Sequence, residues 1–381
     1  MAKLSEICEI KAGGTPSRAK QEYWNGTIPW VKISDFNGKY VNATSERITE
    51  EGLNNSSTKI IKKGSILFTI FATLGEVAIL NIDATTNQAI ASLTLNNSNV
   101  DIDYLYYFLT SLKKYVNELG RGVAQNNINI SILRNIEIPL PPLEIQKQIA
   151  ATLDKVTHTI DTCNAILKKL DLLVKSRFVE MFGTLETPVS GFEYDTLKNL
   201  CRKITDGKHG GCSFEEGTSF YFVGAREIYD DSVHYDTAPE ITAEDFYKDY
   251  KRCNIEKGDF LIVNTGATIG KSAIATDDRT EHTLLQKSVA LMKAKKEKLL
   301  PIFLMYCYKV NDRVYRVESA SAQPNLLLSK INATKIYVPP LTLQQQFATF
   351  VEQTDKTKQQ VKMVLEKAET LKKALMQEYF G

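Results

Sequence analysis

The sequence has no long uncharged apolar run. Hydrophobic residues make up 43% of the 381 residues, yet no stretch reaches the roughly 18 apolar residues that indicate a membrane-spanning helix. The first residues, MAKLSEICEIKAGG, contain no apolar core of signal-peptide length. The sequence therefore predicts a cytoplasmic protein with neither export nor a membrane span.

Cysteine and histidine are few and scattered. The six cysteines include no C-x-x-C pair, and the four histidines are equally dispersed. These spacings exclude the common zinc sites and a small disulfide scaffold. We expect reduced, mostly buried thiols and no metal-binding residues.

The charge balance lacks a strong positive excess. Lysine and arginine total 47 against 45 aspartates and glutamates, which gives a net charge of +2. A protein that coats nucleic acid without specificity would be far more basic. Phosphate binding needs a local basic stripe and not a basic average, so composition alone does not suggest DNA binding but leaves it open.

Motifs for nucleotide binding and methyl transfer are incomplete. GATIGKS (266–272) has three residues between its glycines, whereas a phosphate-binding P-loop needs four. A tight turn between two strands is the favoured interpretation. The Pro-Pro pairs at 141–142 and 339–340 lack the polar and aromatic flanks of an amino-methyltransferase loop. We therefore predict no catalytic residues.

The sequence contains an internal repeat. AQNNI (124–128) recurs as AQPNL (322–326), displaced by 198 residues, and LPPLEIQKQIA (140–150) recurs at the same displacement as VPPLTLQQQFA (338–348). Upstream the register loosens but persists. Each half is therefore a variable module of about 140–155 residues followed by a segment of about 40 residues.

The two shorter segments are predicted to be long helices. Prolines stand at each start, where they are tolerated, and no proline or glycine follows before Phe182 or Phe380. Each helix would be about 60 Å long, which is too long for one module, so we expect the two helices to pack on each other rather than each on its own module. Apolar spacings of four and three indicate a coiled-coil seam, which Val364 and Leu371 would widen. The predicted seam residues are Ile149, Leu153, Val156, Ile160, Leu167, Leu170, Val174, Phe347, Val351, Val361, Leu365 and Leu375.

The modules are predicted to be β-rich, with a helix in each. The apolar runs 66–71 and 260–263 favour strands, and 103–119 and 301–315 are typical of helices. The predicted fold class is α+β, with two pseudo-repeated β-rich domains separated by two long helices that form a coiled coil. The predicted boundaries are 1–141 and 184–339 for the domains, and 142–183 and 340–381 for the helices.

Two polar loops occupy matching positions near the start of each module. GGTPSR (13–18) ends in small hydroxyls and a cation, groups that suit phosphate oxygens and base edges. A solvated loop without a ligand is the alternative for any single residue. ITDGKHGG (204–211) is the counterpart in the second module. Trp30 and Phe222 match each other within apolar strands and are expected to pack in the core.

These features resemble the specificity subunits of type I restriction–modification enzymes. The resemblance rests on GGTPSR followed by IPWVKISDF (28–36), on the ITDGKHG opening, and on the twice-used PPLxxQ helix start. It covers essentially the whole chain. It implies two target recognition domains separated by an antiparallel pair of helices that dock two modification subunits. Each domain would recognise one half of an interrupted double-stranded DNA sequence, and because the modules differ widely, the halves would differ.

The resemblance also implies a non-catalytic subunit that binds no cofactor itself. S-adenosylmethionine, Mg²⁺ and ATP are then expected on the modification (methyltransferase) subunits and on the restriction/translocase subunits of the full complex. The predicted DNA-contacting residues are Thr15, Ser17, Arg18, Lys20, Lys32, Lys208, His209, Arg226 and Lys271.

Two other functions stay open at this point. One is an orphan or shortened specificity component that serves only as a scaffold for modification subunits. The other, from a different class, is a tandem carbohydrate- or peptide-binding protein held on a coiled coil. Salt-sensitive DNA binding would separate the last from the specificity subunit.

Overall fold

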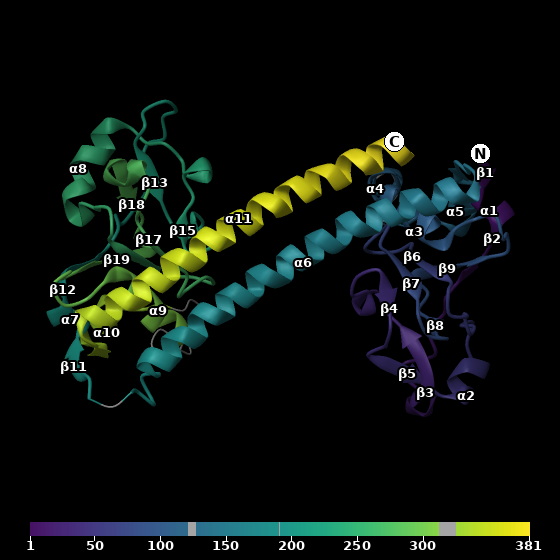
Figure 1. Cartoon of the computed structure of the whole chain (residues 1–381), viewed down its shortest axis with the longest axis horizontal. Coiled ribbons are helices and arrows are strands. Elements are labelled where there is room, and N and C mark those ends of the chain that lie inside the picture. The colour runs from purple at the N-terminus through teal and green to yellow at the C-terminus, as the bar shows by residue number, and fades with distance from the viewer. Residues whose placement is uncertain (121–126, 190, 312–324) are drawn as a thin grey trace. The chain divides into compact units, whose positions relative to one another are not determined.

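The computed structural model describes residues 1–120, 127–189, 191–311 and 325–381 (Figure 1). They form two compact units: unit 1 comprises residues 1–164 and 363–381, and unit 2 comprises residues 165–362. Within these described ranges, no helix is long and apolar enough to span a membrane.

Unit 1 is built around a five-stranded sheet in the order β2–β9–β6–β7–β4. Its neighbouring strands are antiparallel except for β4, which runs parallel to β7. The strands of this sheet are β2 (Cys8–Ala12), β9 (Ile90–Leu95), β6 (Ile66–Thr69), β7 (Val77–Leu80) and β4 (Tyr40–Val41). A three-stranded sheet contains β5 (Glu46–Ile48), β3 (Trp24–Val31) and β8 (Thr85–Thr86), and β1 (Ala2–Lys3) pairs with β10 (Glu137–Ile138). The helices are α1 (Leu4–Ile7), α2 (Glu50–Asn54), α3 (Ile102–Ser111), α4 (Lys113–Gly120) and α5 (Ile130–Asn135).

Unit 2 repeats this arrangement with a four-stranded sheet in the order β12–β19–β16–β17. These strands are β12 (Cys201–Asp206), β19 (Val289–Ala294), β16 (Phe260–Val263) and β17 (Ser272–Ile274). Three pairs accompany them: β13 (Tyr221–Val223) with β18 (Thr283–Leu285), β14 (Ile228–Tyr229) with β15 (Ser232–Val233), and β11 (Glu193–Thr196) with β20 (Lys335–Val338). The helices are α7 (Leu197–Leu200), α8 (Ala243–Cys253), α9 (Pro301–Val310) and α10 (Leu328–Ala333).

The central strand of each sheet is buried on both faces. In β16, Phe260 and Ile262 pack in one core cluster, whereas Leu261 and Val263 pack in another. Alternate residues of a strand point to opposite faces, so a strand covered on both sides needs an unbroken apolar run. Residues 66–69 of β6 are buried in the same way. The predicted strands are confirmed, and with them the α+β class.

A buried glutamine in the repeated PPLxxQ motif fixes the start of each long helix. The side chain of Gln344 accepts a hydrogen bond from the backbone N–H of Leu300 at 2.8 Å. Its amide donates to the carbonyl oxygens of Lys298 at 2.9 Å and Pro339 at 2.8 Å. Gln146 makes the three matching bonds in unit 1. Each glutamine therefore ties a helix start to the connection before α3 or α9.

Replacing Gln344 with leucine should destabilise unit 2 by about 3 kcal/mol, because it leaves one buried N–H and two carbonyl groups without this partner. The urea midpoint of unfolding measures the loss. Gln345→Leu is the matched control, since Gln345 is the next residue on the helix and its side chain is exposed. Equal midpoints for the two variants would show that the three hydrogen bonds do not hold the helix start.

The long helices are α6 (Leu143–Phe182) and α11 (Leu341–Phe380). In unit 1, Leu153 near the start of α6 shares a core with Leu375 near the end of α11. In unit 2, Phe178 near the end of α6 packs against Phe347 near the start of α11, with ring centroids 5.3 Å apart. In both units, the start of one long helix packs against the end of the other, so the two helices are antiparallel, as expected.

The helices pack on the modules as well as on each other. Leu153 lies in the unit 1 core with residues of α3, and Phe347 lies in the unit 2 core with residues of α9. The prediction that the helices pack on each other is confirmed, but the expectation that they do so instead of packing on the modules is wrong. Every predicted seam residue is buried or half-buried. Val364 and Leu371 are 49% and 50% exposed, so the prediction that they widen the seam is wrong.

Candidate nucleic-acid interface

A glycine directly follows β2 in unit 1 and β12 in unit 2. Each glycine lets the following loop approach a second strand closely. A Cβ added at Gly13 would lie 2.0 Å from the carbonyl oxygen of Asn87, and one at Gly207 would lie 2.1 Å from that of Leu285. Only glycine permits such an approach. The two loops predicted from the sequence are thereby held at matching places, against the ends of β8 and β18.

In unit 1 this loop gathers cations and aromatic rings. The guanidinium of Arg18 lies 3.7 Å from the ring centroid of Trp24 and 2.5 Å from a carboxylate oxygen of Glu46. Lys32 binds the other carboxylate oxygen of Glu46 at 2.5 Å. The hydrogen bonds from Arg18 and then from Lys32 lower the pKa of Glu46. Two cations share one carboxylate, so the cluster keeps a net positive charge.

The other predicted residues of this loop adjoin the same cluster. The indole N–H of Trp24 donates to the carbonyl oxygen of Ser17 at 3.1 Å. Thr15 donates to the side chain of Gln88. Lys20 donates to the hydroxyl of Tyr23 at 2.8 Å. The structure therefore brings Thr15, Ser17, Arg18, Lys20 and Lys32 into one region of unit 1.

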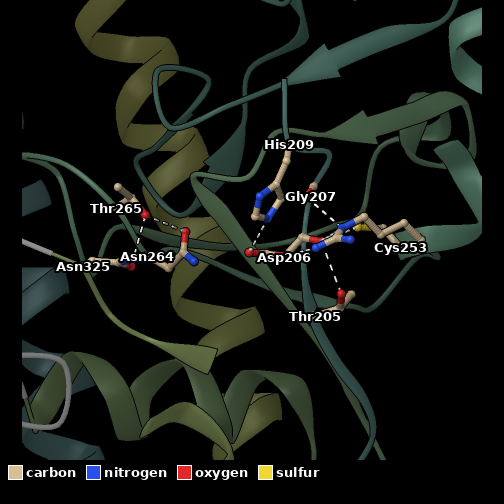
Figure 2. Close-up of polar contacts among 9 residues, drawn as sticks. Thr205, Asp206, Gly207, His209, Cys253, Asn264, Thr265 and Asn325 are labelled. Atoms are coloured by element: carbon tan, nitrogen blue, oxygen red, sulfur yellow. Dashed lines mark hydrogen bonds and ion pairs between the residues drawn. The ribbon is translucent and has the colours of Figure 1, made fainter. Parts of the chain in front are cut away.

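In unit 2 an arginine from α8 holds the matching loop. Arg252 donates to the carbonyl oxygens of Asp206 at 3.0 Å and Gly207 at 2.9 Å, and it pairs with the Asp206 carboxylate. The imidazole of His209 points toward that carboxylate, with Nε2 3.1 Å from Oδ2 (Figure 2). His209 remains 62% exposed. Asp206 therefore orients the imidazole ring of His209, and most of the ring remains accessible to a ligand.

A second polar group in unit 2 lies at the end of the central strand β16 (Figure 2). Thr265 forms an isolated antiparallel bridge with Asn325, and its hydroxyl donates to the Asn325 side-chain oxygen at 3.3 Å. The backbone N–H of Leu326 donates to the carbonyl oxygen of Asn264 at 2.7 Å. Threonine and asparagine present donors and acceptors that match base edges.

Unit 1 has the same backbone arrangement with different side chains. Phe71 forms the matching bridge with Asn127, and Ile128 donates to the carbonyl oxygen of Ile70 at 3.1 Å. Phe71 is 39% exposed. The described ends of the two repeated segments, Asn127–Ile128 and Asn325–Leu326, thus anchor equivalent positions, at which one module presents an aromatic ring and the other a hydroxyl.

Lys208 differs from Arg18 and Lys32 because it pairs with two carboxylates, whereas those two cations share one. Its ammonium lies 2.7 Å from Asp249 and 3.3 Å from Asp245, both on α8, and its side chain is 12% exposed. The hydrogen bond that the Lys208 ammonium donates to Asp249 is the main cause that raises the pKa of Lys208. Binding of a phosphate by Lys208 would require both ion pairs to break.

The near-P-loop sequence is a turn between two antiparallel strands. β16 pairs with β17, and the backbone N–H of Val263 donates to the carbonyl oxygen of Lys271 at 2.8 Å. Gly266 and Gly270 have φ of +99° and +92°, values that favour glycine. The prediction of a turn between two strands is confirmed, but its eight residues, 264–271, make it longer than the tight turn expected. Lys271 and Arg226 are exposed.

The structure shows several site residues that the sequence analysis missed. Asn325 had a signal, because it lies in a repeated segment. Asp206 also had a signal, because it lies in the loop ITDGKHGG, three residues before His209. The others lie outside the motifs that the sequence analysis used. The missed residues are Trp24, Glu46, Asp206, Arg252, Asn264, Thr265 and Asn325.

The cysteines form no disulfide. Five of the six thiols are buried, which confirms the prediction that they are mostly buried, and Cys212 is half-buried. In the described ranges, no three His, Cys, Asp or Glu side chains gather as metal ligands.

Comparisons with known proteins identify relatives over the whole chain. The family described as the type I restriction modification DNA specificity domain matches residues 1–172 and 190–369. The specificity subunit of the type I restriction enzyme MjaIX of Methanocaldococcus jannaschii is 27% identical over 374 residues, covering 92% of this chain and 85% of that protein. The specificity subunit of EcoR124I/EcoR124II of Escherichia coli is 32% identical over 182 residues, covering 45% of this chain and 44% of that one.

Two solved structures share the fold. The S subunit of a type I restriction-modification system from M. genitalium has a TM-score of 0.59 at 20% identity, covering 100% of this chain and 95% of that one. A chain from a study of complex assembly and conformational transition in the type I R-M system has a TM-score of 0.61 at 18% identity, covering 100% and 96%.

Proposed function

Because this chain belongs to the type I restriction–modification DNA specificity family, we propose that it recognises a bipartite, asymmetric DNA sequence, one half with each module. It is a DNA specificity subunit, the non-catalytic subunit of a type I enzyme. The observation that carries the proposal is that both modules use one backbone frame but present different side chains at matching positions. Arg18 and Phe71 stand out in unit 1, and His209 and Thr265 in unit 2.

The chemistry of these groups suits the two parts of DNA recognition. Exposed cations such as Arg18 bind phosphate oxygens and set the position of a module on the duplex. Amide and hydroxyl groups such as Asn325 and Thr265 bind base edges. The proposed recognition domains are residues 1–141 and 184–339, and residues 142–183 and 340–381 are the proposed spacers. Different side chains in one frame explain how one chain recognises two unlike half-sites.

The long helices carry exposed apolar side chains that we assign to docking of two modification subunits. Leu172 and Leu173 on α6 are 62% and 49% exposed, and Met363, Val364 and Leu371 on α11 are 49–57% exposed. Apolar side chains of this size mark protein interfaces when they gather on a surface. S-adenosylmethionine, Mg²⁺ and ATP are assigned to the modification and restriction subunits of the complex.

Arg18→Ala in the complex with modification subunits should weaken DNA binding about tenfold at all sequences. The plot of log affinity against log salt concentration should lose about one unit of slope, because one phosphate contact disappears. Fluorescence anisotropy on a duplex that contains the target measures both quantities.

Lys62→Ala is the control, since Lys62 is 76% exposed and pairs with Asp83 outside this cluster. Equal losses of DNA affinity in the two variants, or an unchanged salt slope for Arg18→Ala, would show that Arg18 does not contact DNA.

A further inference from the structure

Unit 1 contains an open apolar pocket, and none of the predicted DNA-contacting residues is in its lining. Its volume is about 950 Å³, near the upper end of the roughly 300–1,000 Å³ found for ligand sites. It lies among α3, α4, α5 and the last turn of α11, and Glu137 is the charged side chain in its lining. Tyr115, Leu119 and Ile132 in this lining are 50%, 40% and 37% exposed. Such apolar side chains gathered around a cavity indicate a binding surface.

The internal repeat identifies the counterpart of this pocket in unit 2. Gln146 binds the N–H of Asp101 before α3, and Gln344 binds the N–H of Leu300 before α9. Because Asp101 corresponds to Leu300, each residue of α3 has a defined counterpart in α9. Three lining residues of unit 1 then have defined counterparts: Leu112 corresponds to Asn311, Pro139 to Tyr337, and Phe380 to Phe182.

In unit 2 the counterpart residues are covered by the segment that follows α6. The backbone N–H of Leu185 donates to the side-chain oxygen of Asn311 at 2.7 Å. The ring of Phe192 lies 6.4 Å from that of Phe182 and 5.9 Å from that of Tyr337, measured between centroids. Leu185 and Phe192 both pack against the unit 2 core. A peptide segment with a leucine and a phenylalanine therefore occupies this place.

The strand next to the pocket also differs in length between the two units. In unit 2, β11 pairs with β20 over four residues, from Glu193 to Thr196. In unit 1, β1 pairs with β10 over two residues, Ala2 and Lys3. The lining of the unit 1 pocket also carries leucine and proline where unit 2 has asparagine and tyrosine. Extended peptides bind at such places through apolar anchors.

We propose that the unit 1 pocket binds an extended segment of a modification subunit, anchored by a leucine and an aromatic side chain in the manner of Leu185 and Phe192. This inference rests on the proposed function, which supplies the modification subunit as partner. Leu371, about two turns before Tyr379 on α11, links the pocket to the exposed apolar residues of that helix. The pocket therefore extends the proposed docking surface of unit 1.

The first test uses the peptide TLETPVSGF, the sequence of residues 184–192, as a fluorescent probe of the full chain. Anisotropy should show saturable binding, and a peptide with aspartate in place of the leucine and phenylalanine should bind at least about tenfold more weakly. Ile132→Glu in the chain should cause a similar loss. Ile60→Glu, at a position 49% exposed in unit 1 and outside the pocket, should leave binding unchanged.

The second test places the photo-crosslinker benzoylphenylalanine at Leu119 in the complex with modification subunits. Irradiation should link this position to a modification subunit, and the peptide TLETPVSGF should compete. Equal binding of both peptides, or no crosslink in a complex that still binds DNA, would overturn the proposal while the proposed function stands. Failure of the complex to form would contradict the proposed function, and the peptide test would still decide whether the pocket binds such a segment.

Discussion

Exchange of residues 1–141 for the first module of another specificity subunit should change one half of the DNA target and leave the other half unchanged. All the contacts with base edges and phosphates that we propose for unit 1, from Thr15 to Phe71, come from within this module. The second module keeps His209, Thr265 and Asn325, and neither of the two large core clusters of unit 2 includes a residue of the exchanged range 1–141. Each mismatched base pair costs about 1–3 kcal/mol, so a changed half-site should abolish methylation of the original target.

The readout is the methylated sequence found in cells that carry the hybrid subunit and the modification subunit. The reciprocal exchange of residues 184–339 is the matched control, and it should change the opposite half-site. A hybrid that alters both half-sites would show that the two modules do not recognise DNA independently.

Leu153→Asp should unfold unit 1, whereas Leu172→Asp should leave the fold intact and impair assembly. Both leucines lie on α6, but Leu153 is fully buried in the unit 1 core and Leu172 is 62% exposed. Placing a carboxylate in the apolar core costs about 4 kcal/mol or more. An exposed aspartate costs little and disrupts only an apolar contact with a partner.

Two measurements separate these effects. Urea unfolding should show a large loss for Leu153→Asp and almost none for Leu172→Asp. Size-exclusion chromatography with the modification subunit should show reduced complex for Leu172→Asp despite its normal stability. Complete assembly of Leu172→Asp would exclude this face of α6 from docking, and normal stability of Leu153→Asp would contradict the packing of its side chain.

Much of the fold is predictable from the sequence because its signals are local or repeated. The apolar runs of β6 and β16, the prolines before α6 and α11, and the 198-residue repeat each indicate one element or its copy. The pairing of the two helices follows from their apolar seams, whereas their antiparallel direction was implied by the resemblance to the family. The repeat also contained Gln146 and Gln344, whose role becomes clear only when their backbone partners are seen.

The state of each charged side chain was less predictable because its partner is distant in the sequence. Lys208 and Arg18 both stand in polar loops after a glycine. Lys208 pairs with Asp245 and Asp249, brought to it by α8, while Arg18 stacks on Trp24 and remains half exposed. Sequence alone cannot distinguish a cation that stabilises the fold from one that is available to phosphate.

The DNA methylation pattern of the organism that carries this chain tests the central claim most directly. Sequencing that detects methylated bases should be carried out with the gene intact, deleted and restored. We expect one interrupted, asymmetric sequence to be methylated with the intact gene, to lose methylation on deletion and to regain it on restoration. An unchanged methylation pattern after deletion would contradict the assignment of sequence recognition to this chain.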